Sequence, residues 1–222
     1  MSKINTITYR PVNKNDKHKL KELYIEEFGF HRFTNSKLVL NSISNYYLSS
    51  VIHQSTYSLV AIKEHEVVGV IYGRNDTQPH LKHSLKYKLS SFYHFIIIIV
   101  FSLFNLKPIK QALKFDRAYK ILSSECNKAF SGEVTTLIVS KSHQGFGIGK
   151  SLFHSFYDYL LKTNAKSFFL YTDSGLSYGF YEKQGMIREG SKNITLNIKP
   201  RPQNLEIYLY SKDVIPYSDI KI

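Results

Sequence analysis

The stretch EVTTLIVSKSHQGFGIGKSLFHSFYDYL, residues 133–160, decides the fold of this 222-residue chain. Its first part, 133–140, is rich in β-branched residues and predicts a buried strand. Three glycines at alternate positions follow, and apolar residues then recur at helical spacing over 150–162. A glycine loop between a strand and a helix N-terminus exposes backbone N–H groups, so the stretch predicts a binding site for phosphate or another anion.

The glycine spacing excludes two common phosphate-binding loops. Only three residues separate Gly145 from Gly149-Lys150-Ser151, whereas a Walker A loop has four residues there. A dinucleotide-binding loop has its third glycine where Lys150 stands. The pattern Q-x-x-G-x-G, from Gln144 to Gly149, remains to be explained.

The rest of the chain predicts an alternation of strands and helices around this loop. Asp16 is placed to cap a helix over 16–28, and a second helix is expected over 37–53. Polar residues between two β-branched runs predict a hairpin. The other expected elements are strands at 5–12, 56–62, 66–73 and 166–172, a short helix at 175–185, and a closing hairpin of 186–198 and 203–213.

The loop pattern, the order of elements and the segment SYGFYEKQGM, 177–186, together resemble the GCN5-related N-acetyltransferase (GNAT) superfamily. The matching pieces cover residues 5–75 and 132–211. The resemblance implies an α/β (α+β) fold with a mixed, mostly antiparallel seven-stranded sheet flanked by helices. It also implies a single domain over residues 1–222, with an extra helical insertion at 76–131 between the third and fourth strands.

The resemblance implies an acyltransferase that moves an acetyl group from acetyl-CoA, its co-substrate, to a primary amine. In this family the amine attacks the thioester directly in a ternary complex, without a metal. The loop wraps the pyrophosphate, and the strand before it offers backbone groups to the pantetheine arm and an amide to the thioester oxygen. The positions that inherit cofactor-binding roles are Leu137, Ile138, Val139, Gln144, Gly145, Phe146, Gly147, Ile148, Gly149, Lys150, Ser174 and Tyr181.

Two catalytic roles come with the resemblance. Tyr181 matches the tyrosine that protonates the departing thiolate, and Glu133 stands where the family often places the base that deprotonates the amine. Each has a competing interpretation: a packed aromatic residue for Tyr181, and an exposed strand-end carboxylate for Glu133, with the amine binding in its neutral form. The chain departs from the family at Ser174 and Ser177, where Asn and Ala are frequent.

Composition limits the class of protein. The chain holds 30 Lys and Arg against 17 Asp and Glu, a formal charge of +13, which favours anionic partners. Cys126 is the only cysteine, so an intramolecular disulfide and a Cys-rich metal site are excluded. The N-terminus lacks the apolar core of a signal peptide, which makes a cytoplasmic protein the expectation. Scattered lysines without a recognised motif disfavour nucleic acid as the partner.

The insertion 76–131 carries nine Lys and Arg against three Asp and Glu. Its residues 89–106 form a run of 18 without a formal charge, but a membrane span here would divide the sheet between the two sides of a bilayer. Three interpretations stay open: a helix packed on its own domain, a homodimer contact, or an interfacial helix peripheral to an anionic membrane. The alternative function is a catalytically silent GNAT-fold binding module that acts through this insertion.

Overall fold

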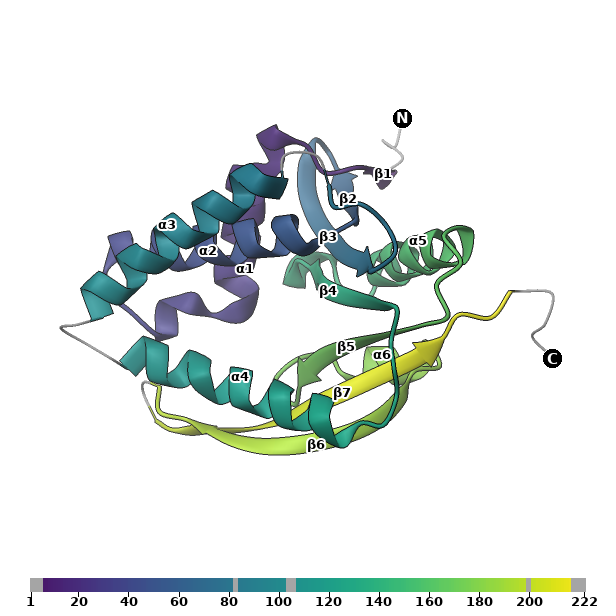
Figure 1. Ribbon diagram of the computed structural model, residues 1–222. Helices are drawn as coiled ribbons and strands as arrows, with labels where there is room; N and C mark the ends of the chain where they lie inside the picture. The colour runs from purple at the N-terminus through teal and green to yellow at the C-terminus, as the bar shows by residue number, and fades with distance from the viewer. Residues whose placement is uncertain (1–5, 82–83, 103–106, 199–200, 217–222) are drawn as a thin grey trace.

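The seven strands of the computed structural model form one sheet in the order β1-β2-β3-β4-β5-β7-β6 (Figure 1). Neighbouring strands are antiparallel except β4 and β5, which pair in parallel. The structure describes residues 6–81, 84–102, 107–198 and 201–216. The strands are β1 Thr8–Arg10, β2 Tyr57–Lys63, β3 Glu66–Asn75, β4 Gly132–Val139, β5 Ser167–Asp173, β6 Ile187–Leu196 and β7 Gln203–Asp213. The mixed, mostly antiparallel sheet predicted from the sequence is confirmed.

Helices cover both faces of this sheet (Figure 1). One face carries α5, Ile148–Lys162, and the short α6, Gly179–Lys183, while the other carries α1, Lys17–Phe28, α2, Lys37–Gln54, and α4, Lys107–Glu125. The predicted helix at 175–185 begins later than expected because residues 173–176 form a turn, in which the Asp173 carboxylate accepts a hydrogen bond from the Gly175 N–H at 2.8 Å.

Helix α5 supplies the largest share of the core beneath the glycine loop. Leu152, Phe153, Phe156 and Leu160 recur on one side of the helix, and each is at most 1% exposed. They pack against the inner side chains of β4 and β5, including Phe168. This packing fixes the N-terminus of α5, and therefore the loop before it, against the end of β4.

Asp16 occupies the N-cap position of α1, as predicted, but its side chain does not cap the helix, because it makes no capping hydrogen bond. Instead, both carboxylate oxygens accept hydrogen bonds at 2.7 Å from the guanidinium of Arg10 in β1, and Oδ2 also accepts one from the Asn13 N–H at 2.8 Å. Hydrogen bonds from a neighbouring cation stabilise a carboxylate more than a hydrogen bond from a neutral helix N–H does. Asp16 therefore connects the first strand to the start of α1.

The insertion forms α3, Ser84–Ser102, followed by α4. Helix α3 packs along α2 rather than on the sheet, and α4 packs on β6 and β7 through Ala118 and Leu122. Among the large apolar side chains of α3, only Ile98 is buried. Packing within the domain therefore accounts for one face of α3 and leaves the other exposed. Residues 103–106 of the expected run lie outside the described residues, and no described helix is long and apolar enough to span a bilayer.

Candidate active site

Strands β4 and β5 part immediately after they meet (Figure 1), and this break in their pairing, the gap between β4 and β5, defines the candidate site. They pair only through Gly132 with Phe168 and Glu133 with Phe169. Their remaining residues have no ladder between them, although both strands continue to pair with their outer neighbours. The two middle strands of the sheet thus present one open backbone edge each, in the interior of the fold.

A bulge in β4 accompanies this separation. Thr136 pairs with Tyr72 and Val134 pairs with Gly73, so Thr135 is an extra residue with no partner in β3. A bulge bends a strand and increases its local twist. Beyond it, β4 turns away from β5 toward the glycine loop.

The register of β4 shows which of its amides face the gap. The Ser140 N–H donates to the Val68 carbonyl at 2.9 Å, and the N–H groups of an antiparallel strand alternate in direction. The Ile138 N–H therefore points to β3, whereas the N–H groups of Leu137 and Val139 point to the gap. Two of the three strand residues predicted for the cofactor thus direct their amides away from β3, to the side where β5 has separated, and Ile138 directs its amide to β3.

The glycine loop is open and unpaired. Gly145 and Gly147 have φ of 84° and 78°, a region that favours glycine, and a Cβ added to either would meet no atom within 4 Å. No backbone N–H of residues 145–150 donates a hydrogen bond within the described chain. Six successive donors at the N-terminus of α5 form a site for an anion, where the helix dipole adds partial positive charge.

The side chains of the loop divide into structural and exposed ones. The Gln144 amide donates to the Val139 carbonyl at 3.0 Å and so ties the loop to the end of β4. Ile148 is buried in the core, whereas the Phe146 ring is 70% exposed, with the Lys63 ammonium 5.9 Å from its centroid. Lys150 is exposed beside the loop. The backbone of the loop, rather than its side chains, makes the anion site.

Helix α6 lies against the same loop. A Cβ on Gly149 would lie within 4 Å of Val139 on one side and the Phe180 ring on the other. The next residue, Tyr181, is half-buried, with its ring centroid 6.4 Å from that of Phe153. The end of β4, the start of α5 and the tyrosine helix therefore converge.

The hydroxyl of Tyr181 makes no hydrogen bond to the residues that the structure describes, and it is not sealed off from solvent. Burial raises the pKa of Tyr181 well above the ordinary value of tyrosine. A phenol is already protonated at physiological pH, and the raised pKa keeps Tyr181 in this state, the state of a proton donor, to a higher pH.

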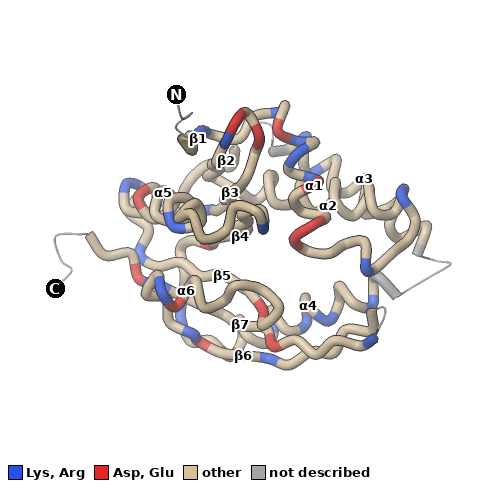
Figure 2. Tube along the Cα trace, turned by 180° about the vertical axis from the view of Figure 1, so that it is seen from behind, with Lys and Arg blue, Asp and Glu red and all other residues tan. Residues whose placement is uncertain are grey.

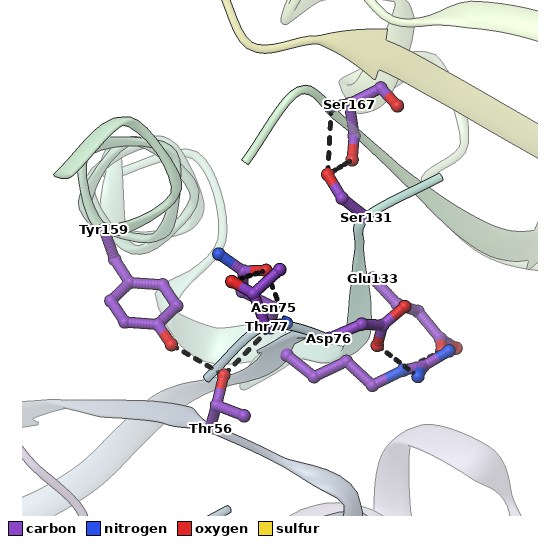
Figure 3. A network of polar contacts seen from close by, with 9 residues as sticks. Thr56, Asn75, Asp76, Thr77, Ser131, Glu133, Tyr159 and Ser167 are labelled. Carbon is purple, nitrogen blue, oxygen red and sulfur yellow. Dashed lines mark hydrogen bonds and ion pairs between the residues drawn. The ribbon is translucent and has the colours of Figure 1, made fainter. Parts of the chain in front are cut away.

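Glu133 lies where the strands part, in a network of polar side chains (Figure 3). Its partner Phe169 packs in the α4 cluster and the next residue, Val134, in the α5 core, so Glu133 is on the face of the sheet that α1, α2 and α4 cover. Its side chain is 20% exposed, and its Oε2 accepts a hydrogen bond from Arg74 Nε at 2.9 Å. Arg74 also pairs with Asp76 at 2.5 Å. Burial raises the pKa of Glu133, and the charge and hydrogen bond of Arg74 oppose that rise without cancelling it. Glu133 is therefore a half-buried, paired carboxylate rather than an exposed strand-end residue.

Ser174 lies at the end of β5 and is held by the neighbouring strand. Its N–H donates to the Glu206 carbonyl at 2.9 Å, and its hydroxyl oxygen accepts from the Glu206 N–H at 3.0 Å. The hydroxyl hydrogen of Ser174 is then left to donate a hydrogen bond to a bound molecule. The hydroxyl thus has a structural role whether or not it contacts the cofactor.

Sequence reasoning missed several residues that surround Glu133. Arg74 is its cross-strand neighbour and could have been found from the register of the predicted strands. On β5, Tyr171 stacks on Tyr119 of α4 with ring centroids 4.3 Å apart, and its hydroxyl donates to the Tyr119 carbonyl at 3.1 Å. Asp173 ends the same strand, and burial raises its pKa. No sequence signal joins α4 to β5, because that contact depends on how the insertion folds back.

Comparison with known proteins agrees with this geometry. Residues 107–186 match the Acetyltransferase (GNAT) family, and this range includes β4, the glycine loop, α5, β5 and α6. No curated protein matches the sequence of this chain. The matched range holds both halves of the candidate site.

Solved structures share the fold at low sequence identity. An N-acetyltransferase from Staphylococcus aureus Mu50 is 11% identical, with a TM-score of 0.51 over 95% of this chain and 99% of that one. The protein yncA from Salmonella typhimurium, solved with its cofactor acetyl-CoA, is 12% identical, with a TM-score of 0.54 over 96% and 97%. Arabidopsis thaliana Naa50, in complex with the bisubstrate analogue CoA-Ac-MVNAL, is 18% identical, with a TM-score of 0.53 over 93% and 97%.

Proposed function

This chain is a member of the GNAT superfamily by its fold and by the sequence match over residues 107–186, and from that premise we propose that it is an acetyl-CoA-dependent N-acetyltransferase acting on a primary amine. One observation carries the proposal. Where β4 has parted from β5, its Leu137 and Val139 amides point away from β3, and the strand continues into the six unpaired N–H groups of the loop.

The residues at the gap fit acetyl-CoA in both of its parts. The unpaired N–H groups of residues 145–150 suit a pyrophosphate, because glycine backbone lets the donors approach phosphate oxygens closely. The open edge of β4 suits the amides of a pantetheine arm, because it can hydrogen-bond as it would to another strand. Structural neighbours with this fold have been solved with acetyl-CoA or a CoA-containing analogue, which supports the same assignment.

Acetyl-CoA supplies an acyl group already activated as a thioester. The outward N–H of Leu137 or Val139 would donate to the acyl oxygen as negative charge develops on it, a contribution of about 3 kcal/mol in other acyl-transfer enzymes. Because the acceptor nitrogen attacks directly, the chain needs no nucleophile of its own. Cys126 accordingly has no role in this mechanism.

Transfer from a thioester to an amine leaves one proton to remove and one to supply. Glu133 would accept the proton of the amine, directly or through water, with Arg74 fixing its orientation. Tyr181, whose phenol is protonated at physiological pH, would give its proton to the departing thiolate. The reaction is then balanced, with an amide and a thiol as products.

A primary amine is the acceptor that best suits this site. The face of the sheet that carries Glu133 is lined by the tyrosine pair of α4 and β5, and Asp173 is also there. Among the described residues, Asp173 has no ion pair with a Lys or Arg. The peptide part of the analogue bound by Arabidopsis Naa50 supports amines as acceptors for this fold.

Calorimetric titration with acetyl-CoA tests the proposal, using two substitutions at one loop position. Gly147→Glu and Gly147→Gln place side chains of equal size at a φ of 78°, so the backbone strain is shared and only the charge differs. We expect the wild type to bind, the Gln variant to bind more weakly and the Glu variant to bind least, because its carboxylate repels the pyrophosphate. Failure of the folded wild type to bind, or equal binding by the two variants, would contradict the assignment of the loop.

A further inference from the structure

Helix α3 presents a continuous apolar surface to solvent. Nine of the seventeen exposed large apolar side chains in the described part of the chain belong to this one helix. Six of them follow one another at intervals of three, four or one residue, which places them on one side of a helix. We call them the α3 strip: Leu85, Leu89, Phe92, Ile96, Ile99 and Val100.

The opposite side of α3 is fixed to the protein. Ser90 and Ser49 of α2 are hydrogen-bonded at 3.1 Å, and at the edge of this side the partly exposed ring of Phe95 lies 5.8 Å from that of Tyr46. Ile98 is buried on this side. Helix α3 therefore cannot turn its strip inward without losing its contact with α2. An exposed apolar surface of several neighbouring side chains on a folded protein marks a site that contacts another molecule or a membrane.

The charges around the strip identify the kind of partner. Lys86 and Lys88 are exposed in the first turns of α3, and Lys110 is exposed in α4, beyond the other end of the strip. Neither α2 nor α3 contains an Asp or Glu (Figure 2). The surface thus combines apolar side chains with cations and offers no carboxylate in either helix to pair with them.

A lipid surface matches this combination better than a second copy of the chain does. Two copies would bring together chains of charge +13, with no carboxylate on either α2 or α3 to pair with the lysines. Anionic headgroups supply the missing negative charge, and the acyl layer beneath them accepts the apolar side chains. Lysines at the border of such a surface extend their ammonium groups to the headgroups.

We infer that the α3 strip docks this protein on an anionic lipid surface, with α3 lying flat at the headgroup level and Lys86 and Lys88 at the lipid phosphates. A helix of 19 residues lying in this way is about 28 Å long. The inference does not depend on the enzymatic proposal, because no residue of the strip belongs to the gap between β4 and β5.

The chain contains no tryptophan, which gives a direct test. Phe92→Trp introduces a single fluorophore at a strip residue that is 62% exposed, and Ile187→Trp introduces one at a residue of β6 that is 61% exposed. With vesicles of phosphatidylcholine and phosphatidylglycerol, we expect the emission of Phe92→Trp to shift to the blue and that of Ile187→Trp to remain unchanged. Vesicles of phosphatidylcholine alone should bind much more weakly.

The lysines are tested on the Phe92→Trp background. Replacing Lys86 and Lys88 with Gln should lower the partition coefficient for anionic vesicles by about fivefold for each lysine. Both residues are exposed, so the melting temperature should stay the same and serves as the control for folding. An unchanged partition coefficient for the folded double variant would overturn the role of these lysines.

Two other results would overturn the docking itself. One is no blue shift of Phe92→Trp with anionic vesicles, or an equal shift in both tryptophan variants. The other is a blue shift without vesicles that grows with protein concentration, together with a dimer mass by light scattering. That second result would assign the α3 strip to a homodimer interface instead.

Discussion

Glu133 pairs with Phe169, and this is the last pair that joins β4 to β5. The carboxylate that we propose as the base is therefore at the point where the two strands part. It extends from the sheet face opposite α5. The backbone gap beyond this pair is proposed to hold the acyl donor, so an acceptor approaching from the α1, α2 and α4 face would meet Glu133 first.

Replacing Glu133 with Gln should lower kcat by about a hundredfold, because a general base typically contributes a factor of that order or more. The base acts in its ionised form, and burial raises the pKa of Glu133 above the ordinary 4.5. The wild-type rate should therefore fall as the pH decreases through that raised pKa, and the Gln variant should lack this acidic limb. Steady-state kinetics across the acidic range measure both effects.

Asp76→Asn is the matched control, because Asp76 is the other carboxylate that pairs with Arg74. If Glu133 only holds Arg74 in place, the two variants will have similar rates and the same pH profile as the wild type. A selective loss of the acidic limb in Glu133→Gln is expected if Glu133 moves a proton.

Replacing Tyr181 with Phe should lower kcat by a factor of about a hundred and leave the affinity for acetyl-CoA unchanged. As the proposed proton donor, the phenol would act in its protonated form, and burial raises its pKa above the ordinary 10.0. The wild-type rate should consequently show no loss attributable to Tyr181 below about pH 10. Product formation and calorimetric affinity, measured on the same preparation, separate the chemical step from binding.

Tyr210→Phe controls for the loss of a phenol in the same cluster of rings. The Tyr210 ring centroid lies 6.2 Å from that of Tyr181, and its hydroxyl donates to the Glu182 carboxylate at 2.7 Å. This variant should lose about 1 kcal/mol of stability and keep its kcat. Equal losses of kcat in both variants would show that Tyr181 acts through packing.

The order of elements could be predicted from the sequence because most of them have a clear period. In α5, for example, Leu152, Phe156 and Leu160 repeat at four residues, and all three are buried as the pattern requires. The parting of β4 and β5 has no such signal. It depends on a bulge at Thr135, and a bulge leaves the alternation of a short strand almost unchanged, so the sequence pattern does not predict where the two strands separate.

Helix α3 shows a second limit of sequence reasoning. Periodicity assigns the buried face of a helix only when the other face is polar, and residues 95–101 are apolar throughout. A helix that packs entirely within the domain and a helix with an exposed apolar strip are therefore compatible with the same sequence. Asp16 shows a third limit. An acidic residue before a helix can cap that helix or pair with a nearby cation such as Arg10, and the sequence does not distinguish the two roles.

Replacing Gln144 with Ala should weaken acetyl-CoA binding several-fold and change the stability of the fold little. The Gln144 amide holds the loop against the Val139 carbonyl, and its loss frees the loop without affecting the core. A less ordered loop must lose more conformational entropy on binding. Calorimetry on Gln144→Ala and thermal melting of the same variant measure the two quantities. A large loss of stability with unchanged affinity would contradict this role.

Replacing Asp16 with Asn should lower the free energy of unfolding by about 2 kcal/mol at neutral pH, because Asp16 is 5% exposed and accepts two hydrogen bonds from Arg10. Burial disfavours the ionised form of Asp16, but the Arg10 and Asn13 hydrogen bonds and the Arg10 charge outweigh it and lower the pKa. A lowered pKa stabilises the fold fully above the ordinary 3.8 and loses that effect as the pH falls toward the folded pKa. Urea unfolding should therefore separate wild type from Asp16→Asn at pH values near 7, and the difference should shrink below the ordinary pKa. Glu22→Gln, at an exposed ion pair with Lys19, is the control and should change the unfolding free energy by less than about 0.5 kcal/mol.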